Sequence, residues 1–324
     1  MKEYLSKDIR NVVLLGHSGS GKTALVESAL FKTKAIDRMG KTTDGTAAMD
    51  YDPEEAKRGL SVFTAVAPIE WKNTKINILD TPGYLDYEGE KVSGAAVADL
   101  AVVVVSAKEG IESGTESAVK LCKKNNLPIV FFINKIDDDN ANFEKTVDDL
   151  RSKFGSSVVP FEVPVMEGHK MTGSAKVLDD SSNPHYDQIS EAIASADDEL
   201  MEKFFMEEPL TPEEIAKGLK AGIVNGDIYP VYACSGYNTD AVDLLLNGIV
   251  ASAPDATHAA EGDIKVDESA PVAAVCFKTI DDRFGKMSFF KVISGKISSA
   301  VPAYNSRTEN QEKIGKMISL KEEG

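Results

Sequence analysis

Residues 16–23, Gly-His-Ser-Gly-Ser-Gly-Lys-Thr, match the pattern G-x-x-x-x-G-K-[ST] of a phosphate-binding loop. Glycines in such a loop let the backbone approach a phosphate closely, because they lack a Cβ. The pattern predicts that Lys22 pairs with the β- and γ-phosphates and that the Thr23 hydroxyl ligates Mg²⁺. The other residues expected around the phosphates are His17, Ser18, Gly19, Ser20 and Gly21.

The flanks of this loop have the periodicity that a phosphate site requires. Residues 11–15 form a short apolar run that is typical of a buried strand. Behind the loop, Leu25 and Ala29, like Val26 and Leu30, are four residues apart, as on one helix face. The strand therefore leads into a helix N-terminus, where free N–H groups and the helix dipole attract anions. An ordinary Gly/Ser-rich turn is the alternative, and the two matching flanks argue against it.

A hydroxyl that could complete a magnesium site follows a long polar stretch. Residues 34–58 lack sustained apolar periodicity and predict a functional loop. Arg-Gly-Leu-Ser at 58–61 closes it, and the Ser61 hydroxyl could reach Mg²⁺ and the γ-phosphate in the triphosphate state. A plain turn entering a strand is the alternative.

The next motif, Asp80-Thr81-Pro82-Gly83, ends a predicted hairpin of residues 61–71 and 75–79. A carboxylate at a strand end can hold Mg²⁺ through water, as in phosphate-loop NTPases. Asp80 is therefore expected to join Thr23 and Ser61 at the metal, and the Gly83 N–H is expected to reach the γ-phosphate.

Base recognition is predicted for Asn134-Lys135-Ile136-Asp137, after buried strands at 100–106 and 127–133. Asp137 can accept from the N1–H and the amine of guanine, whereas adenine would leave this carboxylate unpaired. The Lys135 stem is expected to cover the base, and Asn134 to tie this loop to the phosphate site. A strand at 229–234 leads to Ser235 and Gly236, whose backbone could contact guanine O6.

Composition excludes several classes of protein. The net charge of −16 argues against sequence-independent DNA binding, which needs clustered Lys and Arg, although it leaves room for structured RNA. Three separated cysteines show no disulfide or zinc pattern. Residues 1–10 lack the apolar segment of a signal peptide, and residues 100–105 are too few to span a bilayer. We therefore expect a cytoplasmic protein without a membrane partner.

The 324 residues are long enough for two domains. Alternating strands and helices predict an α/β fold, a doubly wound and mostly parallel sheet, over 1–260. An α+β subdomain is expected at about 157–226, behind a helix at 142–154, with a strand through Phe161–Val165, a loop at 169–184 and two helices. Its acidic residues predict a solvated face or a docking surface for a partner.

The ordered motifs 16–23, 58–61, 80–83, 134–137 and Cys-Ser-Gly at 234–236 resemble those of the translational GTPases. The insert after Asp137 resembles that of the elongation factor G group, and residues 265–324 resemble a truncated start of its second domain, a β-barrel. The resemblance implies a GTP-hydrolysing factor with GTP/GDP, Mg²⁺ and a ribosomal partner. It also implies that the chain is the N-terminal part of a protein about twice as long, and we expect this fragment to be monomeric or weakly associated.

Three departures from elongation factor G separate the chain from the housekeeping translocase. Tyr84 stands where the family has the histidine that positions the attacking water, so the catalytic set becomes Lys22, Ser61, Gly83 and Tyr84. Ser18 and Gly19 replace an apolar residue and an aspartate, and Ser61 replaces a threonine. A GTPase of the ribosomal-protection type, which removes tetracycline, is an alternative, as is a GTP-binding switch with slow turnover. Since a phenol is a poor base near neutral pH, Tyr84 predicts weak intrinsic hydrolysis.

Overall fold

The computed structural model describes residues 4–50, 52–236, 239–257, 264, 266–282, 285–299 and 302–318. The chain divides into two compact units, a larger one of Tyr4–Ala256 and a smaller one that contains Thr257–Gly324. None of the described helices is long and apolar enough to cross a membrane.

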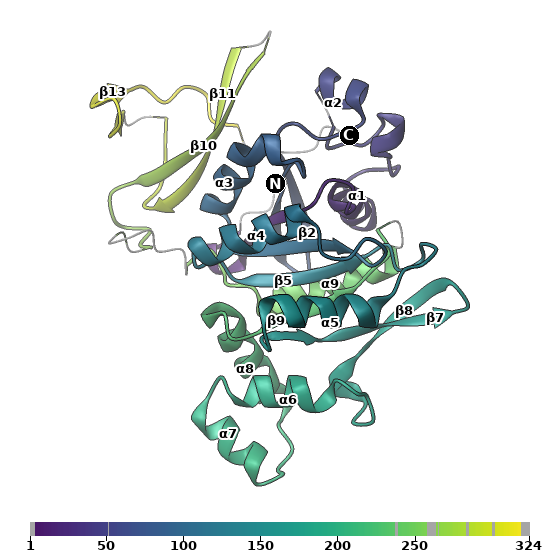
Figure 1. Ribbon diagram of the computed structural model, residues 1–324. Coiled ribbons are helices and arrows are strands. Elements are labelled where there is room, and N and C mark those ends of the chain that lie inside the picture. The colour runs from purple at the N-terminus through teal and green to yellow at the C-terminus, as the bar shows by residue number, and fades with distance from the viewer. Residues whose placement is uncertain are drawn as a thin grey trace. The chain divides into compact units, whose positions relative to one another are not determined.

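The larger unit is built on a seven-stranded sheet in the order β2-β3-β1-β4-β5-β9-β6 (Figure 1). Every neighbouring pair is parallel except the antiparallel hairpin of β2 and β3. The predicted doubly wound, mostly parallel sheet is therefore confirmed. The strands are β1 (Ile9–Gly16), β2 (Ala65–Trp71), β3 (Thr74–Asp80), β4 (Leu100–Ser106), β5 (Ile129–Asn134), β6 (Val158–Pro160) and β9 (Tyr229–Ala233).

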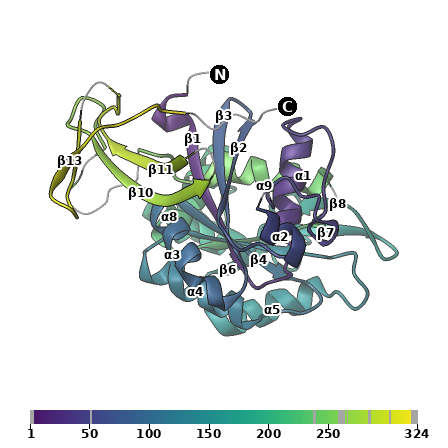
Figure 2. The same ribbon diagram turned by 90° about the horizontal axis from the view of Figure 1, so that it is seen from above.

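Helices cover both faces of this sheet, and Figure 2 shows α3, α4 and α5 on one side of the strands and α1 and α9 on the other. All seven residues of β4 are buried, as expected for a strand between two helical layers. The carboxyl ends of β1, β3, β4 and β5 therefore meet at one edge of the sheet. The helices are α1 (Lys22–Lys32), α3 (Glu88–Val97), α4 (Ser113–Lys124), α5 (Phe143–Phe154) and α9 (Thr239–Ser252).

The segment between α5 and β9 differs from the prediction in three ways. Its first strand, β6, joins the main sheet beside β9. The expected loop at 169–184 instead contains β8 (Lys170–Lys176), which pairs with β7 (Glu162–Glu167), and a short 3-10 helix, η4 (Val177–Asp179). Three helices follow, not two: α6 (Tyr186–Ala194), α7 (Asp198–Phe205) and α8 (Pro212–Asn225). Strand β8 escaped prediction because its residues are mostly polar, so the pairing with β7 is needed to recognise it.

The stretch expected as a loop at 34–58 contains α2 (Pro53–Arg58). Asp52 caps it and forms a capping box with Glu55, and Pro53 occupies the first helical position. Helix α2 has only six residues, too few for apolar periodicity to show, although its capping signal was present. The remaining 3-10 turns are η1 (Ser6–Asp8), η2 (Thr42–Asp44) and η3 (Leu85–Tyr87). The first hairpin strand starts at Ala65, later than the predicted residue 61.

The smaller unit contains two antiparallel strand pairs among its described residues. Strand β10 (Ala273–Asp282) pairs with β11 (Gly285–Ser294), and β12 (Ala303–Asn305) pairs with β13 (Asn310–Glu312). This is a small antiparallel region that follows the larger unit in the sequence. The expected β-barrel remains a prediction.

Candidate nucleotide-binding site

The predicted phosphate loop lies between β1 and α1, and α1 begins at Lys22. Gly21 has a φ of 96°, a conformation that favours glycine, and a Cβ there would lie 2.2 Å from Asn134 Nδ2. Only a glycine lets the phosphate loop approach the predicted base loop so closely.

Lys22 is buried, and its Nζ donates to the carbonyl oxygens of Gly16 at 3.2 Å and His17 at 3.0 Å. Burial lowers the pKa of the Lys22 ammonium to about 8, although the Asp80 charge opposes this change. A cation that is desolvated and bonded to neutral carbonyls gains most from an anionic partner. The surroundings of Lys22 therefore suit a phosphate.

The predicted metal-binding side chains meet in one cluster. The Thr23 hydroxyl donates to Asp80 Oδ2 at 2.8 Å and lies 3.3 Å from the Ser61 hydroxyl. Burial raises the pKa of Asp80 to about 6, against the opposing effect of the Lys22 charge. Asp80 Oδ1 has no hydrogen-bond partner among the described residues. Two hydroxyls beside an unpaired carboxylate oxygen are the hard ligands that Mg²⁺ takes.

Asp50 also belongs to this cluster, and sequence reasoning missed it. Its Oδ1 accepts from the Ser61 hydroxyl at 3.2 Å, and its buried Oδ2 has no partner among the described residues. Burial raises the pKa of this carboxyl as well. No pattern in the polar stretch around Asp50 marks it, because only the folded chain brings it to Ser61.

Two buried glutamates hold the polar stretch that ends at Ser61. Glu27 of α1 accepts from the backbone N–H of Gly40 at 2.9 Å and of Ala48 at 2.5 Å. Glu55 accepts from the N–H groups of Val62 at 2.9 Å and Phe63 at 3.0 Å. These charge-assisted bonds place Ser61 beside Thr23.

Gly83 lies directly against the phosphate loop. A Cβ at Gly83 would be 2.5 Å from the Ser18 nitrogen and 2.7 Å from Lys22 Nζ. The backbone of the Asp-Thr-Pro-Gly motif therefore approaches the expected γ-phosphate position as only glycine allows. The neighbouring Tyr84 has 44% of its surface exposed.

The predicted base loop is tied to the phosphate loop and to the end of β9. Asn134 Nδ2 donates to the Ser20 carbonyl at 2.9 Å, and the Ile136 N–H donates to the Cys234 carbonyl at 3.4 Å. Ser28 of α1 donates through its hydroxyl to the Gly236 carbonyl. The buried Asn134 Oδ1 and Ser20 Oγ have no partner among the described residues, so polar atoms remain available for a ligand.

Three other predicted residues lie around this site. Lys135 has a φ of 62°, which turns the chain sharply after β5. Ser235 is half-buried and immediately precedes Gly236. His17 faces α4, where its Nδ1 accepts from the Gly114 N–H at 3.2 Å and its Nε2 lies 3.4 Å from Glu112 Oε1. The structure thus brings the predicted motifs to one edge of the sheet, with the His17 ring directed toward α4.

Asp137 has a partner that sequence reasoning also missed. Its Oδ1 accepts from the Met171 backbone N–H at 2.6 Å, and Met171 belongs to β8 of the insert. Nothing in the sequence marks this donor, because it is a backbone group of a strand that sequence reasoning did not predict.

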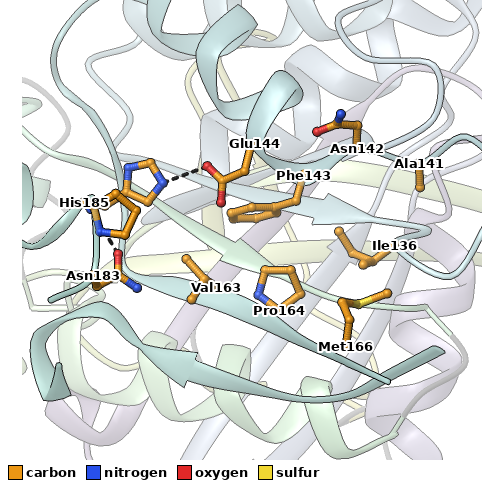
Figure 3. Close-up of a pocket in the computed structure, with 11 residues that line it drawn as sticks. Ile136, Ala141, Asn142, Phe143, Glu144, Val163, Pro164, Met166, Asn183 and His185 are labelled. Carbon is orange, nitrogen blue, oxygen red and sulfur yellow. Dashed lines mark hydrogen bonds and ion pairs between the residues drawn. The ribbon is translucent and has the colours of Figure 1, made fainter. Parts of the chain in front are cut away.

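A pocket of about 340 Å³ lies beside the base loop (Figure 3). Ile136 and Phe143 line one side of it, and Val163 and Met166 of β7 line the other. His185 Nε2 is bonded to Glu144 Oε2 at 2.8 Å at its edge. The pocket therefore lies between the end of the base loop and the insert hairpin.

Comparisons with known proteins agree with this arrangement. Residues 7–255 match the family model described as the elongation factor Tu GTP binding domain. The chain is also similar to the protein ttk003000868 from Thermus thermophilus, known from its crystal structure, with a TM-score of 0.85 and 30% sequence identity. The match covers 95% of this chain and 48% of the Thermus chain, so this chain spans about half the length of that protein.

Fold and motifs define the class, a phosphate-loop GTPase with a doubly wound sheet. The chain belongs to the family that carries the elongation factor Tu GTP-binding domain, and the predicted resemblance to the translational GTPases is confirmed. This family implies the binding of guanine nucleotides and their hydrolysis.

Proposed function

We propose that the protein is a translation factor of the elongation factor G type, which binds GTP on the ribosome and hydrolyses it to GDP and phosphate. The observation that carries this proposal is the contact of Asn134 with Ser20, because it joins a guanine-type base loop to a phosphate loop. The insert between Asp137 and Ser235 supports the elongation factor G type within the family.

In this proposal the phosphate end of the site neutralises charge. Lys22 pairs with the β- and γ-phosphates, and the backbone N–H groups of the phosphate loop and Gly83 bond their oxygens. Thr23, Ser61 and Asp80 would hold Mg²⁺, and Asp50, bonded to the Ser61 hydroxyl, would add negative charge beside it. When bound, Mg²⁺ supplies positive charge to the phosphate oxygens.

At the base end, Asp137 accepts from the guanine N1–H and amine, while the Lys135 stem covers the base. Asn134 holds the base loop against the phosphate loop through its bond to Ser20. The backbone at Ser235 and Gly236 closes the site near guanine O6. Adenine would leave the Asp137 carboxylate without its donors, which discriminates strongly against adenine nucleotides.

Hydrolysis by the isolated chain is proposed to be weak. Tyr84 can orient water through its hydroxyl but is a poor base near neutral pH. The Tyr84 ring is exposed, which supports the proposal that no side chain positions the attacking water until a partner presses Tyr84 inward. Such a group contributes a factor of about 10²–10⁴ in rate.

The experiment that tests this function measures GTP hydrolysis by the full-length protein with and without ribosomes. We expect ribosomes to raise the rate. If position 84 lacks a water-positioning group, Tyr84→His raises the stimulated rate further. If the Tyr84 hydroxyl positions water, Tyr84→Phe lowers it, and two unchanged rates would place residue 84 away from the chemistry.

Two other functions compete with this one. A GTP-binding switch with slow turnover is favoured by the exposed Tyr84, and it predicts tight GTP binding without stimulation by ribosomes. A ribosomal-protection GTPase predicts stimulation together with release of tetracycline from the ribosome. Under the translation-factor proposal we expect a cytoplasmic location, no DNA or membrane partner and a monomeric or weakly associated chain.

A further inference from the structure

We infer that the hairpin of β7 and β8 in the insert positions the carboxylate that recognises the base, through the Met171 N–H. The inference rests on the proposed guanine-nucleotide function. Met171 is fully buried, and its N–H lies 2.6 Å from Asp137 Oδ1. Hydrogen bonds from N–H groups to carboxylates at this distance are among the strong ones. Such a bond to one oxygen restricts the rotation of the carboxylate.

The register of the hairpin explains why this donor is available. Val165 pairs with Gly173, whereas Met166 pairs with Met171, so Thr172 is an extra residue on β8. A bulge of this kind bends the strand and changes where its backbone groups point. Strand β8 pairs only with β7 among the described strands, so its other edge can serve a different acceptor. Met171 uses that edge to bond Asp137.

The hairpin itself is anchored to the central sheet. The Phe161 N–H donates to the Val231 carbonyl of β9 at 2.9 Å, and the Val177 N–H donates to the Phe161 carbonyl at 3.0 Å. The rings of Phe161 and Tyr232 lie 5.6 Å apart between centroids. The hairpin is therefore bonded to β9 directly at Phe161, and its other end at Val177 is bonded to Phe161, so the Met171 N–H occupies a defined position relative to the base loop.

The bond leaves Asp137 able to bind a base. A carboxylate offers about four lone-pair positions on its two oxygens. The Met171 N–H takes one, which leaves enough acceptors for the guanine N1–H and amine. The insert thus supports base recognition and does not compete with the base.

The test compares the affinities of GDP, inosine diphosphate and ADP for the wild-type protein and two variants. Met171→Pro removes the N–H, and Met171→Leu keeps it with a similar side chain. Inosine lacks the amine of guanine, so it reports on the orientation of the carboxylate.

We expect Met171→Pro to bind GDP about tenfold more weakly, the loss typical of one hydrogen bond to a charged group. We also expect it to discriminate less between GDP and inosine diphosphate, while Met171→Leu remains close to wild type. Unchanged or tighter GDP binding by Met171→Pro would overturn the inference, and so would an equal loss for both nucleotides.

If Met171→Pro does not fold, the α-hydroxy analogue of methionine at position 171 removes the same N–H and keeps the side chain, with the same expected and contrary results. A wild-type protein that binds ADP as well as GDP would overturn the proposed function and this inference with it. A wild-type protein that prefers GDP to ADP, together with GDP affinity and a ratio of GDP to inosine diphosphate affinity that are unchanged by loss of the N–H, would overturn the inference alone.

Discussion

The phosphate loop and the base end of the site are held by contacts between residues that lie at very different separations in the sequence. Lys22 is bonded to carbonyls five and six residues before it. At the base end, the bond from Asn134 to Ser20 joins residues 114 positions apart, and the bond from Ser28 to Gly236 joins residues 208 positions apart. The phosphate loop is therefore largely a local structure, whereas the base end exists only when the whole sheet is formed.

The two ends of the proposed site should therefore contribute differently to binding: the phosphate loop to affinity for any nucleotide, and the base end to the choice of base. A loop of backbone N–H groups with one lysine attracts any nucleotide phosphate, because it reads only charge. Discrimination between bases depends on an acceptor at a defined place, and in the proposed site that place is set by β5, β9 and the insert hairpin. Damage at the phosphate end should thus weaken all nucleotides, whereas damage at the base end should change which nucleotide is preferred.

The largest effect is expected from Lys22→Met at the phosphate end. Loss of the charged hydrogen bonds to phosphate should weaken GTP and GDP by about 10²–10³-fold, because each such bond contributes about 1.5–3 kcal/mol. Lys32→Met at the far end of α1, where Lys32 forms a partly buried ion pair with Asp243, should bind as wild type because it lies away from the phosphate loop. Titration calorimetry measures the nucleotide affinities of both variants. Retained affinity in Lys22→Met would contradict the assignment of the phosphate loop to the nucleotide site.

Asp137→Asn should change base preference at the other end. GTP should weaken by about 10²-fold, because the amide presents a donor to guanine donors and leaves polar groups unpaired. Xanthosine triphosphate, whose extra carbonyl suits an amide donor, should bind better than to the wild type. Competition with a fluorescent nucleotide measures both affinities. The exposed neighbour substitution Asp138→Asn should change neither, and equal losses for the two nucleotides would contradict the assignment of Asp137.

The insert hairpin contains a buried carboxyl group, Glu162, that should make the stability of the protein depend on pH. Burial raises the pKa of Glu162 to about 7, with the Ser174 hydroxyl, 3.1 Å away, opposing this change. The folded state therefore holds this proton more tightly than the unfolded state, whose Glu pKa is about 4.3. The free energy of unfolding should fall by about 2–3 kcal/mol as the pH rises from about 4.5 through 7.

Glu162→Gln should remove most of that dependence and stabilise the protein at pH 8. Denaturant unfolding at pH 5 and pH 8 measures it, with Glu167→Gln on the exposed end of β7 as the control. An identical pH dependence in Glu162→Gln and the wild type would show that Glu162 does not carry the effect.

The smallest effect concerns α3, near the phosphate end. Lys91 has 1% of its side chain exposed and bonds Glu88 at 3.0 Å, whereas the Glu88 side chain is 43% exposed and also accepts from Ser117. Glu88→Gln leaves a buried cation without its carboxylate, whereas Lys91→Met leaves a carboxylate that water can reach. We expect Glu88→Gln to destabilise the protein by about 1–2 kcal/mol more than Lys91→Met. Thermal unfolding compares the two, and the opposite order would contradict the argument.

The amino-acid sequence by itself determined the phosphate loop, the motifs after β3, β5 and β9, and the doubly wound sheet. These features are local: a strand end followed by a glycine or a carboxylate can be recognised without knowing its neighbours. Buried strands such as β4 can be recognised in the same way, because they are continuous apolar runs.

Only the tertiary structure decided which distant groups complete the site. Asp50 lies in a stretch without periodicity and reaches Ser61 because Glu27 and Glu55 hold the intervening backbone. Met171 contributes a backbone N–H, a group that every residue except proline has, so its role depends on a bulge in β8 and on the anchoring of the hairpin to β9. A side-chain type can be recognised in a sequence, whereas the direction of a backbone group is set by the packing of the folded chain.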